Sequence, residues 1–213
     1  PGLEGIRPDT LSIPGLAALE PALRKAVLRL WLRRLGFRTP DSAHLGRILG
    51  EVLTARPDAD PLVAWQGCEV RRYRSDLFAL SPLPPVPGPL SLPWTGTRLA
   101  LPAPLGVLER RIDGPGGVPE RLDVRFGVTG LACRDRPGGR TKSLKGCFQG
   151  LGIPPWIRPY LPLVFADGRL IWVGGIGLCL GAGKRVDDRI DWRGHPWESA
   201  GLFRWDHLDE GRA

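Results

Sequence analysis

Proline is concentrated in one stretch of this 213-residue sequence, and that stretch limits how the chain can fold. Eight prolines lie within 23 positions, at Pro82, Pro84, Pro85, Pro87, Pro89, Pro93, Pro102 and Pro104. Proline lacks a backbone N–H and fixes φ, so this density disfavours a helix and a central strand alike. The sequence therefore predicts a Pro/Gly-rich connector with short strands over residues 83–120, between one domain at 1–82 and another at 121–213.

The first 82 residues carry two helix patterns followed by a β-hairpin pattern. A helix is predicted over residues 21–36, because Pro21 suits a first helical position and Gly36 suits the end. Its leading apolar stripe is Leu19, Leu23, Val27 and Leu30, and a second set widens it, namely Leu28, Trp31, Leu32 and Leu35. A second helix is predicted from Asp41 or Ser42 to Arg56, and strands are predicted over 62–66 and 69–80, joined at Gly67. This part is expected to be a helical-hairpin domain with a short β-hairpin.

Residues 121–213 mix strand, helix and turn signals. Residues 122–128 alternate as a strand, and residues 161–165 and 169–173 have a hairpin pattern around the turn dipeptide Asp167-Gly168. Between them a helix is predicted, capped by Thr141 and closed by Gly152. Beyond Gly174 the chain is glycine-rich, then acidic and rich in tryptophan, and no element is predicted there. The whole chain is therefore expected to be α+β, ending in a small α/β domain.

Positive charge is concentrated in one segment. Lys and Arg number 30 against 22 Asp and Glu, and residues 121–169 hold nine bases against three acids. A local basic surplus favours a polyanionic partner, because cations that neutralise phosphates release condensed counterions. Nucleic acid is therefore the leading partner class. Arginines outnumber lysines 26 to 4, so arginine that only keeps the surface solvated stays an alternative.

The sequence shows no pattern of a catalytic or metal site. Its cysteines, Cys68, Cys133, Cys147 and Cys179, and its three histidines are spaced too widely for a zinc motif or a Cys/His nucleophile pair. We expect reduced structural thiols, as in a cytoplasmic protein. Residues 177–184 lack the spacing of a phosphate-binding P-loop, and Arg185 replaces its Ser or Thr, so no bound cofactor is expected in this part. No stretch holds the roughly 20 apolar residues of a membrane span. Without methionine and with Pro1 first, the sequence is expected to be a fragment.

The most specific motif spans residues 136–158. It begins with the turn Arg136-Pro-Gly-Gly-Arg140, continues as Thr-Lys-Ser-Leu-Lys-Gly-Cys-Phe-Gln, and ends with Gly-Ile-Pro-Pro-Trp-Ile-Arg158. Three devices in it favour anion binding: glycines that let amides approach a phosphate, the amides of a helix starting near Thr141, and the charges of Arg140, Lys142 and Lys145. A capped helix beside a solvated basic turn is the structural alternative.

This motif, followed by Leu161-Pro-Leu-Val-Phe165, resembles the C-terminal domain of the bacterial tRNA(Ile)-lysidine synthetase family. The family pattern is a basic Gly-rich turn, Ser-Leu-Lys, Phe-Gln, Gly-(Val/Ile)-Pro-Pro-Trp-(Leu/Ile)-Arg and Pro-Leu-(Val/Leu)-Phe, in the same order. The middle domain of the family is similar to Leu11-Ser-Ile-Pro14, Leu28-Arg-Leu-Trp-Leu32 and Glu69-Val-Arg-Arg-Tyr73. The resemblance covers most of residues 10–175.

The resemblance implies the tRNA-recognition portion of an ATP-dependent ligase that joins lysine to the wobble cytidine of tRNA(Ile). ATP, with magnesium, and lysine would be bound by a catalytic domain whose Ser-Gly-Gly-x-Asp-Ser loop is absent from this sequence. No catalytic residue is therefore carried over, and this portion alone is expected to be inactive. The expected tRNA contacts are Arg140, Lys142, Lys145 and Arg158, with Arg71 and Arg72 as weaker candidates.

Each of these expectations has an alternative. Arg71 and Arg72 are neighbours on a predicted strand, so their side chains face opposite ways, and one is expected to pair with an acid such as Glu69 or Asp76. Trp156 is expected to anchor the core rather than to stack on a base. For the whole chain, the alternative is a structural or dimerisation module that braces the catalytic domain, with some of the eight tryptophans as interface anchors.

Overall fold

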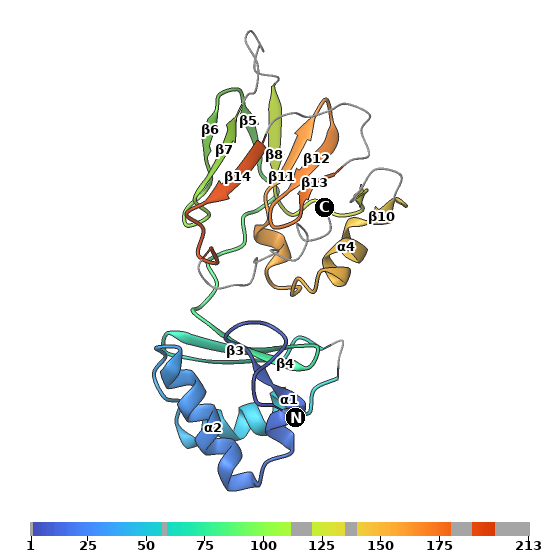
Figure 1. The fold of residues 1–213 in the computed structure, drawn as a ribbon. Coiled ribbons are helices and arrows are strands. Elements are labelled where there is room, and N and C mark those ends of the chain that lie inside the picture. The colour runs from blue at the N-terminus through green and yellow to red at the C-terminus, as the bar shows by residue number, and fades with distance from the viewer. Residues whose placement is uncertain (1, 57–58, 112–120, 135–139, 180–188, 199–213) are drawn as a thin grey trace. The chain divides into compact units, whose positions relative to one another are not determined.

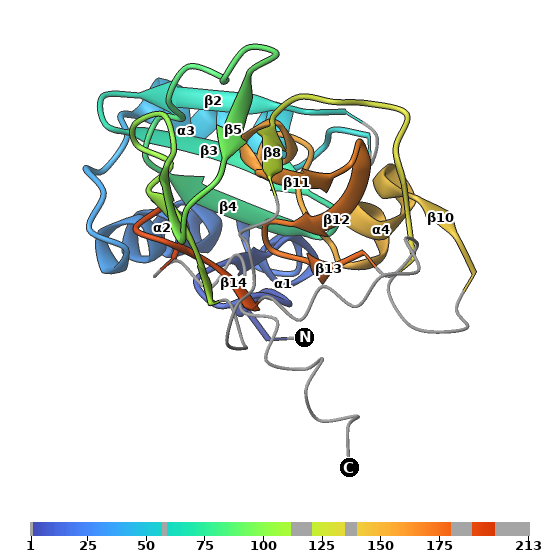
Figure 2. The same cartoon turned by 90° about the horizontal axis from the view of Figure 1, so that it is seen from above.

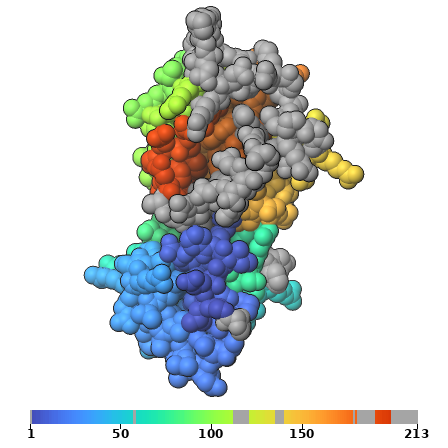
Figure 3. Space-filling model, viewed as in Figure 1, coloured from blue at the N-terminus to red at the C-terminus, as the bar shows by residue number. Residues whose placement is uncertain are grey.

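The computed structural model describes residues 2–56, 59–111, 121–134, 140–179 and 189–198. The chain divides into two compact units, Pro1–Pro84 (unit 1) and Pro85–Ala213 (unit 2). Figure 3 shows the surface of each unit, with the residues of unit 1 in blue to teal and those of unit 2 in green to red. Within the described residues, no helix is long and apolar enough to cross a membrane.

Unit 1 is an antiparallel sheet with helices packed on one face (Figures 1 and 2). Its strands are β1 (Leu11–Ser12), β2 (Leu62–Trp65), β3 (Cys68–Tyr73) and β4 (Asp76–Leu80), in the order β1-β4-β3-β2. Its helices are α1 (Ile13–Ala17), α2 (Pro21–Arg34), α3 (Ser42–Arg47) and the π-helical turn η1 (Ile48–Val52). The core between helices and sheet is aliphatic, and its fully buried members include Leu28, Leu32, Leu45, Val63, Val70 and Leu77.

The helix α2 begins and ends close to where the sequence predicts. Pro21 is its first residue, and Gly36 follows it with φ +82° while Phe37 N donates to Leu32 O at 2.9 Å, which is a glycine-closed helix end. The predicted leading stripe is wrong in part, because Leu23 and Leu30 are 52% and 62% exposed. The buried face is the second set instead, since packing rather than spacing decides which of two overlapping stripes meets the sheet.

The long strand predicted over residues 69–80 is two strands, β3 and β4, joined by a tight turn at Arg74 and Ser75. Arg74 adopts φ +56°, a left-handed conformation that glycine usually supplies. Directly after the turn, the buried carboxylate of Asp76 accepts from Ile6 N at 2.9 Å and from Thr10 Oγ1 at 3.2 Å. The turn has no Gly, Pro or Asn, and Ser75-Asp76 is a weaker turn signal, so the two strands were predicted as one.

In its described residues, unit 2 consists of antiparallel sheets, a short α-helix and a 3-10 turn (Figure 1). The largest sheet has the order β13-β12-β11-β8-β5 and contains β5 (Ser91–Trp94), β8 (Leu122–Arg125), β11 (Leu163–Ala166), β12 (Arg169–Val173) and β13 (Gly177–Leu178). The second, in the order β14-β7-β6, contains β6 (Arg98–Ala100), β7 (Val107–Arg111) and β14 (Arg189–Arg193). The pair β9 (Ala132–Cys133) and β10 (Lys142–Ser143) leads directly into α4 (Leu144–Gly150), and a 3-10 turn, η2 (Arg158–Tyr160), precedes β11.

Short strands were predicted in the connector stretch, and the structure has β5, β6 and β7 there. They belong to the sheets of unit 2, where Trp94 and Leu108 are buried. The strand β14 lies in the tail for which no element was predicted, and it pairs with β7. The predicted hairpin around Asp167-Gly168 is confirmed as β11 and β12, with both turn residues at positive φ. Helices and strands together confirm the expected α+β class.

Candidate nucleic-acid interface

Three of the predicted phosphate contacts lie close together in the chain and face solvent. Arg140 precedes β10, Lys142 is in β10, and Lys145 is in the first turn of α4, and all three side chains are exposed. We call these three residues the basic face. The antiparallel pairing of β10 with β9 fixes the backbone of this face, since Lys142 lies opposite Cys133 and Ser143 opposite Ala132. The first part of the predicted turn, residues 136–139, lies outside the described residues.

The start of α4 differs from the prediction. Its cap is Ser143 rather than Thr141, because Ser143 Oγ accepts from Gly146 N at 3.1 Å. The strand β10 extends the chain through residue 143, so the helix begins at Leu144, whose own N–H donates to Leu131 O at 2.8 Å. Two of the first helical amides are thus already bonded within the protein. Attraction for an anion at this point therefore comes from side-chain charge more than from helix amides.

Arg158 is half-buried and is held inside unit 2. Its Nε and Nη2 donate to Ile153 O at 3.1 and 2.8 Å, and its Cζ lies 5.7 Å from the centroid of the Phe148 ring. These contacts fix the turn after α4. Trp156 lies in the same turn and is 7% exposed, which confirms the prediction that it anchors the core. The structure leaves the predicted tRNA contact of Arg158 untested and gives this side chain a bracing role as well.

A cavity of about 500 Å³ brings Arg158 and Lys145 together. The cavity lies between the loop after β8, the start of α4 and the turn η2. Its lining residues are Gly127, Val128, Thr129, Gly130, Leu131, Ser143, Leu144, Lys145, Phe148, Arg158, Pro159 and Leu163. The loop 127–131 was not identified as part of a site from the sequence, although the pair Gly127 and Gly130, both at positive φ, was a readable signal of an irregular loop.

Arg71 and Arg72 are engaged inside unit 1. The side chain of Arg71 is 12% exposed and lies between Glu69 Oε2, at 3.0 Å, and Asp60 Oδ2, at 3.5 Å. Arg72 Nη1 donates to Leu53 O at 2.6 Å, at the end of η1, and its Nε donates to Arg74 O at 3.1 Å. The expected ion pair with Glu69 is present. Contact of either arginine with RNA stays a prediction.

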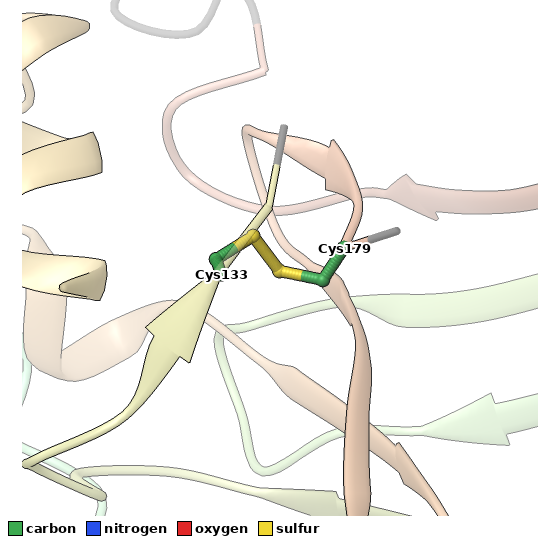
Figure 4. Close-up of a disulfide and its surroundings, with 2 residues drawn as sticks. All are labelled: Cys133 and Cys179. Carbon is green, nitrogen blue, oxygen red and sulfur yellow. A yellow bond between two sulfur atoms is a disulfide. The ribbon is translucent and has the colours of Figure 1, made fainter. Parts of the chain in front are cut away.

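The expectation of four reduced thiols is wrong. Cys133, at the end of β9, and Cys179, after β13, form a disulfide with their Cα atoms 5.3 Å apart (Figure 4). The two cysteines are 46 positions apart in sequence and meet only because the fold brings β9 beside the edge of the large sheet. Cys68 and Cys147 are free and buried, and burial together with the negative charge of Glu69 raises the pKa of Cys68 to about 12. The Cys68 thiol therefore stays protonated and unreactive at neutral pH.

The described parts of the chain contain no group of three or more His, Cys, Asp or Glu side chains placed to hold a metal ion. Most of the P-loop-like stretch lies outside these parts, at residues 180–184. The described residues offer instead exposed positive charge beside a cavity, and none of those that line it is acidic.

In the comparison with known proteins, each unit contains a stretch that matches a protein-family model. Residues 11–78 match the family described as the TilS substrate binding domain, and residues 122–192 match the TilS substrate C-terminal domain. Curated relatives named tRNA(Ile)-lysidine synthase include that of Methylococcus capsulatus, 34% identical over 197 residues, which cover 87% of this chain and 44% of the relative. The relative from Yersinia pseudotuberculosis is 37% identical over 190 residues, covering 79% of this chain and 41% of the relative. The chain thus spans about two fifths of the length of these relatives.

Proposed function

Since the chain belongs to the tRNA(Ile)-lysidine synthase family, we propose that it is the tRNA-recognition portion of such a ligase. The ligase would join lysine to the wobble cytidine of tRNA(Ile) at the expense of ATP, with magnesium, in a part of the protein that this chain does not include. The chain itself would hold the tRNA, and by itself it would not catalyse the ligation.

The observation that carries this proposal is the basic face. Arg140, Lys142 and Lys145 project charge from a backbone fixed by the β9–β10 pairing, and within the described residues no ion pair neutralises Arg140 or Lys145. Folded RNA can be recognised through phosphates and 2′-hydroxyls without base-edge contacts, which suits such a surface. Arg71, Arg72 and Arg158 are weaker candidates for tRNA contact, because their guanidinium groups already bind partners inside the protein.

The test is the affinity of the chain for tRNA(Ile) at several salt concentrations. The variant Arg140→Gln, Lys142→Gln, Lys145→Gln should bind less tightly, and the slope of log K against log salt should become shallower by roughly two to three, at up to about 0.9 per lost phosphate contact. The residues changed are exposed, so the fold should not suffer.

A matched control removes three exposed positive charges elsewhere in unit 2, as Arg111→Gln, Arg121→Gln, Arg169→Gln. Arg121 and Arg169 flank the end of the large sheet where Leu122 pairs with Ala166, opposite the end where Leu163 lines the cavity. The control should keep most of the affinity. Equal losses in the two variants would indicate net charge alone, and an unchanged slope in the first variant would refute the proposed interface.

A bracing role is the second candidate, and the exposed apolar residues of α2 favour it. Leu23 and Leu30 are seven residues apart in α2, so they lie on the same face of the helix, and both are largely exposed. The tryptophans of the tail support it less, because Trp192 and Trp197 pack against His195 inside unit 2. Self-association of the chain in sedimentation, abolished by Leu23→Gln with Leu30→Gln and accompanied by no affinity for tRNA, would favour bracing.

A further inference from the structure

The cavity beside Lys145 has the size of a small-molecule site. Its volume of about 500 Å³ falls within the range of roughly 300–1,000 Å³ that is typical of ligand pockets. It can accept one nucleoside but not a base pair with its two backbones. The surrounding elements are rigidly attached to the fold, since Leu144 N is bonded to Leu131 O and Arg158 to Ile153 O.

The inner walls are apolar and include an aromatic ring. Leu144, Phe148 and Leu163 are each less than 8% exposed and line the cavity. The guanidinium of Arg158 lies over the Phe148 ring, with Cζ 5.7 Å from the ring centroid, so one face of the ring is already covered by a planar cation. Unpaired bases of RNA stack on aromatic rings and on guanidinium planes.

The rim supplies polar groups and positive charge. The exposed loop residues 127–130, which include the hydroxyl-bearing Thr129, line the cavity, and glycine at positions 127 and 130 allows the positive φ that this path needs. Among the described residues that line the cavity, Lys145 and Arg158 carry charge and none is Asp or Glu. A planar apolar group attached to an anion fits this combination, whereas a free cation such as lysine does not.

We propose that the cavity takes one unpaired nucleotide of the bound tRNA, with its base between the apolar walls and its phosphate beside Lys145 and Arg158. This inference rests on the proposed function. It adds a contact to a base of the tRNA to the contacts that the basic face makes with phosphates. The basic face and the cavity then have different roles in tRNA binding. The basic face attracts the RNA, and the cavity selects an RNA that has a base available outside a helix.

The test fills the cavity without touching its charges. Val128 lines it from the exposed loop and is 36% exposed itself, so Val128→Trp should obstruct the space while leaving Lys145 and Arg158 in place. We expect affinity for tRNA(Ile) to fall by about 5- to 150-fold, the range found on losing one stacked base. Affinity for a blunt RNA duplex and the salt slope of that binding should not change. Val128→Ala is the matched control and should bind both RNAs as the wild type does.

Unchanged tRNA affinity in Val128→Trp would overturn the cavity proposal alone, provided that the wild type still binds tRNA in a salt-dependent way. If the wild type shows no salt-dependent binding of tRNA, the proposed function itself would be overturned. Should Val128→Trp fold poorly, the amide resonances of Gly127 and Gly130 in the wild type give a second readout: they should shift with a single-stranded RNA pentamer and not with the duplex.

A free mononucleotide has the same chemistry as the RNA nucleotide, so AMP is the third probe. Under the proposal, AMP binds weakly and competes with tRNA for the cavity. Tight binding of AMP that leaves tRNA affinity unaltered would assign the cavity to a free nucleotide and overturn the proposal.

Discussion

His195 shows how burial changes the chemistry of a single residue. The imidazole is 8% exposed and stacks on Trp192, with ring centroids 3.8 Å apart and 22° between the planes. Burial lowers the pKa of His195 from 6.5 to about 4, although the nearby Glu198 acts in the opposite direction. The ring is therefore neutral at pH 7 and serves as part of an aromatic cluster with Trp192, Trp197 and Tyr160.

This shift predicts a loss of stability in acid. Because the folded pKa lies below the unfolded value of 6.5, the unfolded chain binds the proton more readily. The contribution of His195 is complete above pH 6.5 and is lost as the pH falls toward 4, by no more than about 3 kcal/mol in total because solvent screens part of the effect. Denaturant unfolding of unit 2 at pH 7.5, 5.5 and 4.5 measures it. His195→Phe should remove that part of the pH dependence, and an identical pH profile in the variant would contradict the assignment.

At this scale, the sequence predicted residue types better than it predicted partners. Arg158 was assigned to RNA, and Arg71 and Arg72 were weaker candidates, one of which was expected to pair with an acid. Each of the three binds a carboxylate or carbonyl of the chain. A guanidinium group has five donors, which can bind phosphate, carboxylate or carbonyl oxygens. Which of these acceptors lies nearest to a given arginine depends on the fold and cannot be derived from the sequence alone.

Among the elements, the turn that leads into β7 tolerates no side chain. Gly106 has φ +74°, and a Cβ at this position would collide with Arg193 O and lie 2.7 Å from the carbonyl carbon of Gly194. The obstacle is the backbone at the end of β14, which pairs with β7 and cannot rotate away as a side chain could. Gly106 therefore allows the start of β7 to lie in close contact with the end of β14.

Gly106→Ala is expected to destabilise unit 2 strongly. The matched control is Gly168→Ala in the β11–β12 turn, where φ is +76° but nothing lies within 4 Å of the new Cβ. The control should cost only the left-handed penalty of about 1–2 kcal/mol, and Gly106→Ala should cost at least about twice as much because of the added collision. Chemical denaturation of the two variants measures the difference. Equal costs would show that the backbone of β14 yields to the methyl group.

Elements with local signals were predictable, and elements held by distant partners were not. Pro21 and Gly36 marked α2, and Asp167-Gly168 marked the β11–β12 hairpin. By contrast, β14 depends on β7, with Arg193 paired to Val107, and the cap of α4 moved from Thr141 to Ser143 because β10 pairs with β9. The disulfide belongs to the same class, since the spacing of Cys133 and Cys179 says nothing about their proximity. Of the candidate site, the charges were predicted and the cavity was not, because a cavity is formed by packing.

On the scale of the whole molecule, the chain contains two separately built units. The buried core residues described in unit 1 come from its own helices and sheet, and the disulfide lies wholly within unit 2. The boundary at Pro84 and Pro85 falls inside the run of prolines from which the sequence predicted a division. Conditions that act on one unit should therefore leave the other unaffected.

Reduction of the disulfide should separate the two units in stability. Opening a cross-link between residues 46 positions apart removes about 4 kcal/mol by the loop-closure estimate, and only unit 2 should lose it. Hydrogen exchange with and without dithiothreitol measures this, as protection lost in β8, β11 and β12 and retained in β3 and β4. The double variant Cys133→Ser, Cys179→Ser should match the reduced protein. Cys68→Ser, in the core of unit 1, should lose protection in β3 and β4 and keep it in β8, β11 and β12. Loss of protection in both units would mean that they unfold together.

The pairing of β7 with β14 has a consequence for how the protein is made. Unit 1 has all of its strands once Leu80 has been synthesised, so it can fold while the ribosome is still translating the rest. Unit 2 has to wait, because β7 stays without one of its two neighbours until residues 189–193 have left the ribosome. A nascent chain that stalls in this interval presents a finished first unit and, in the second, the bare edge of β7 to other chains and to chaperones.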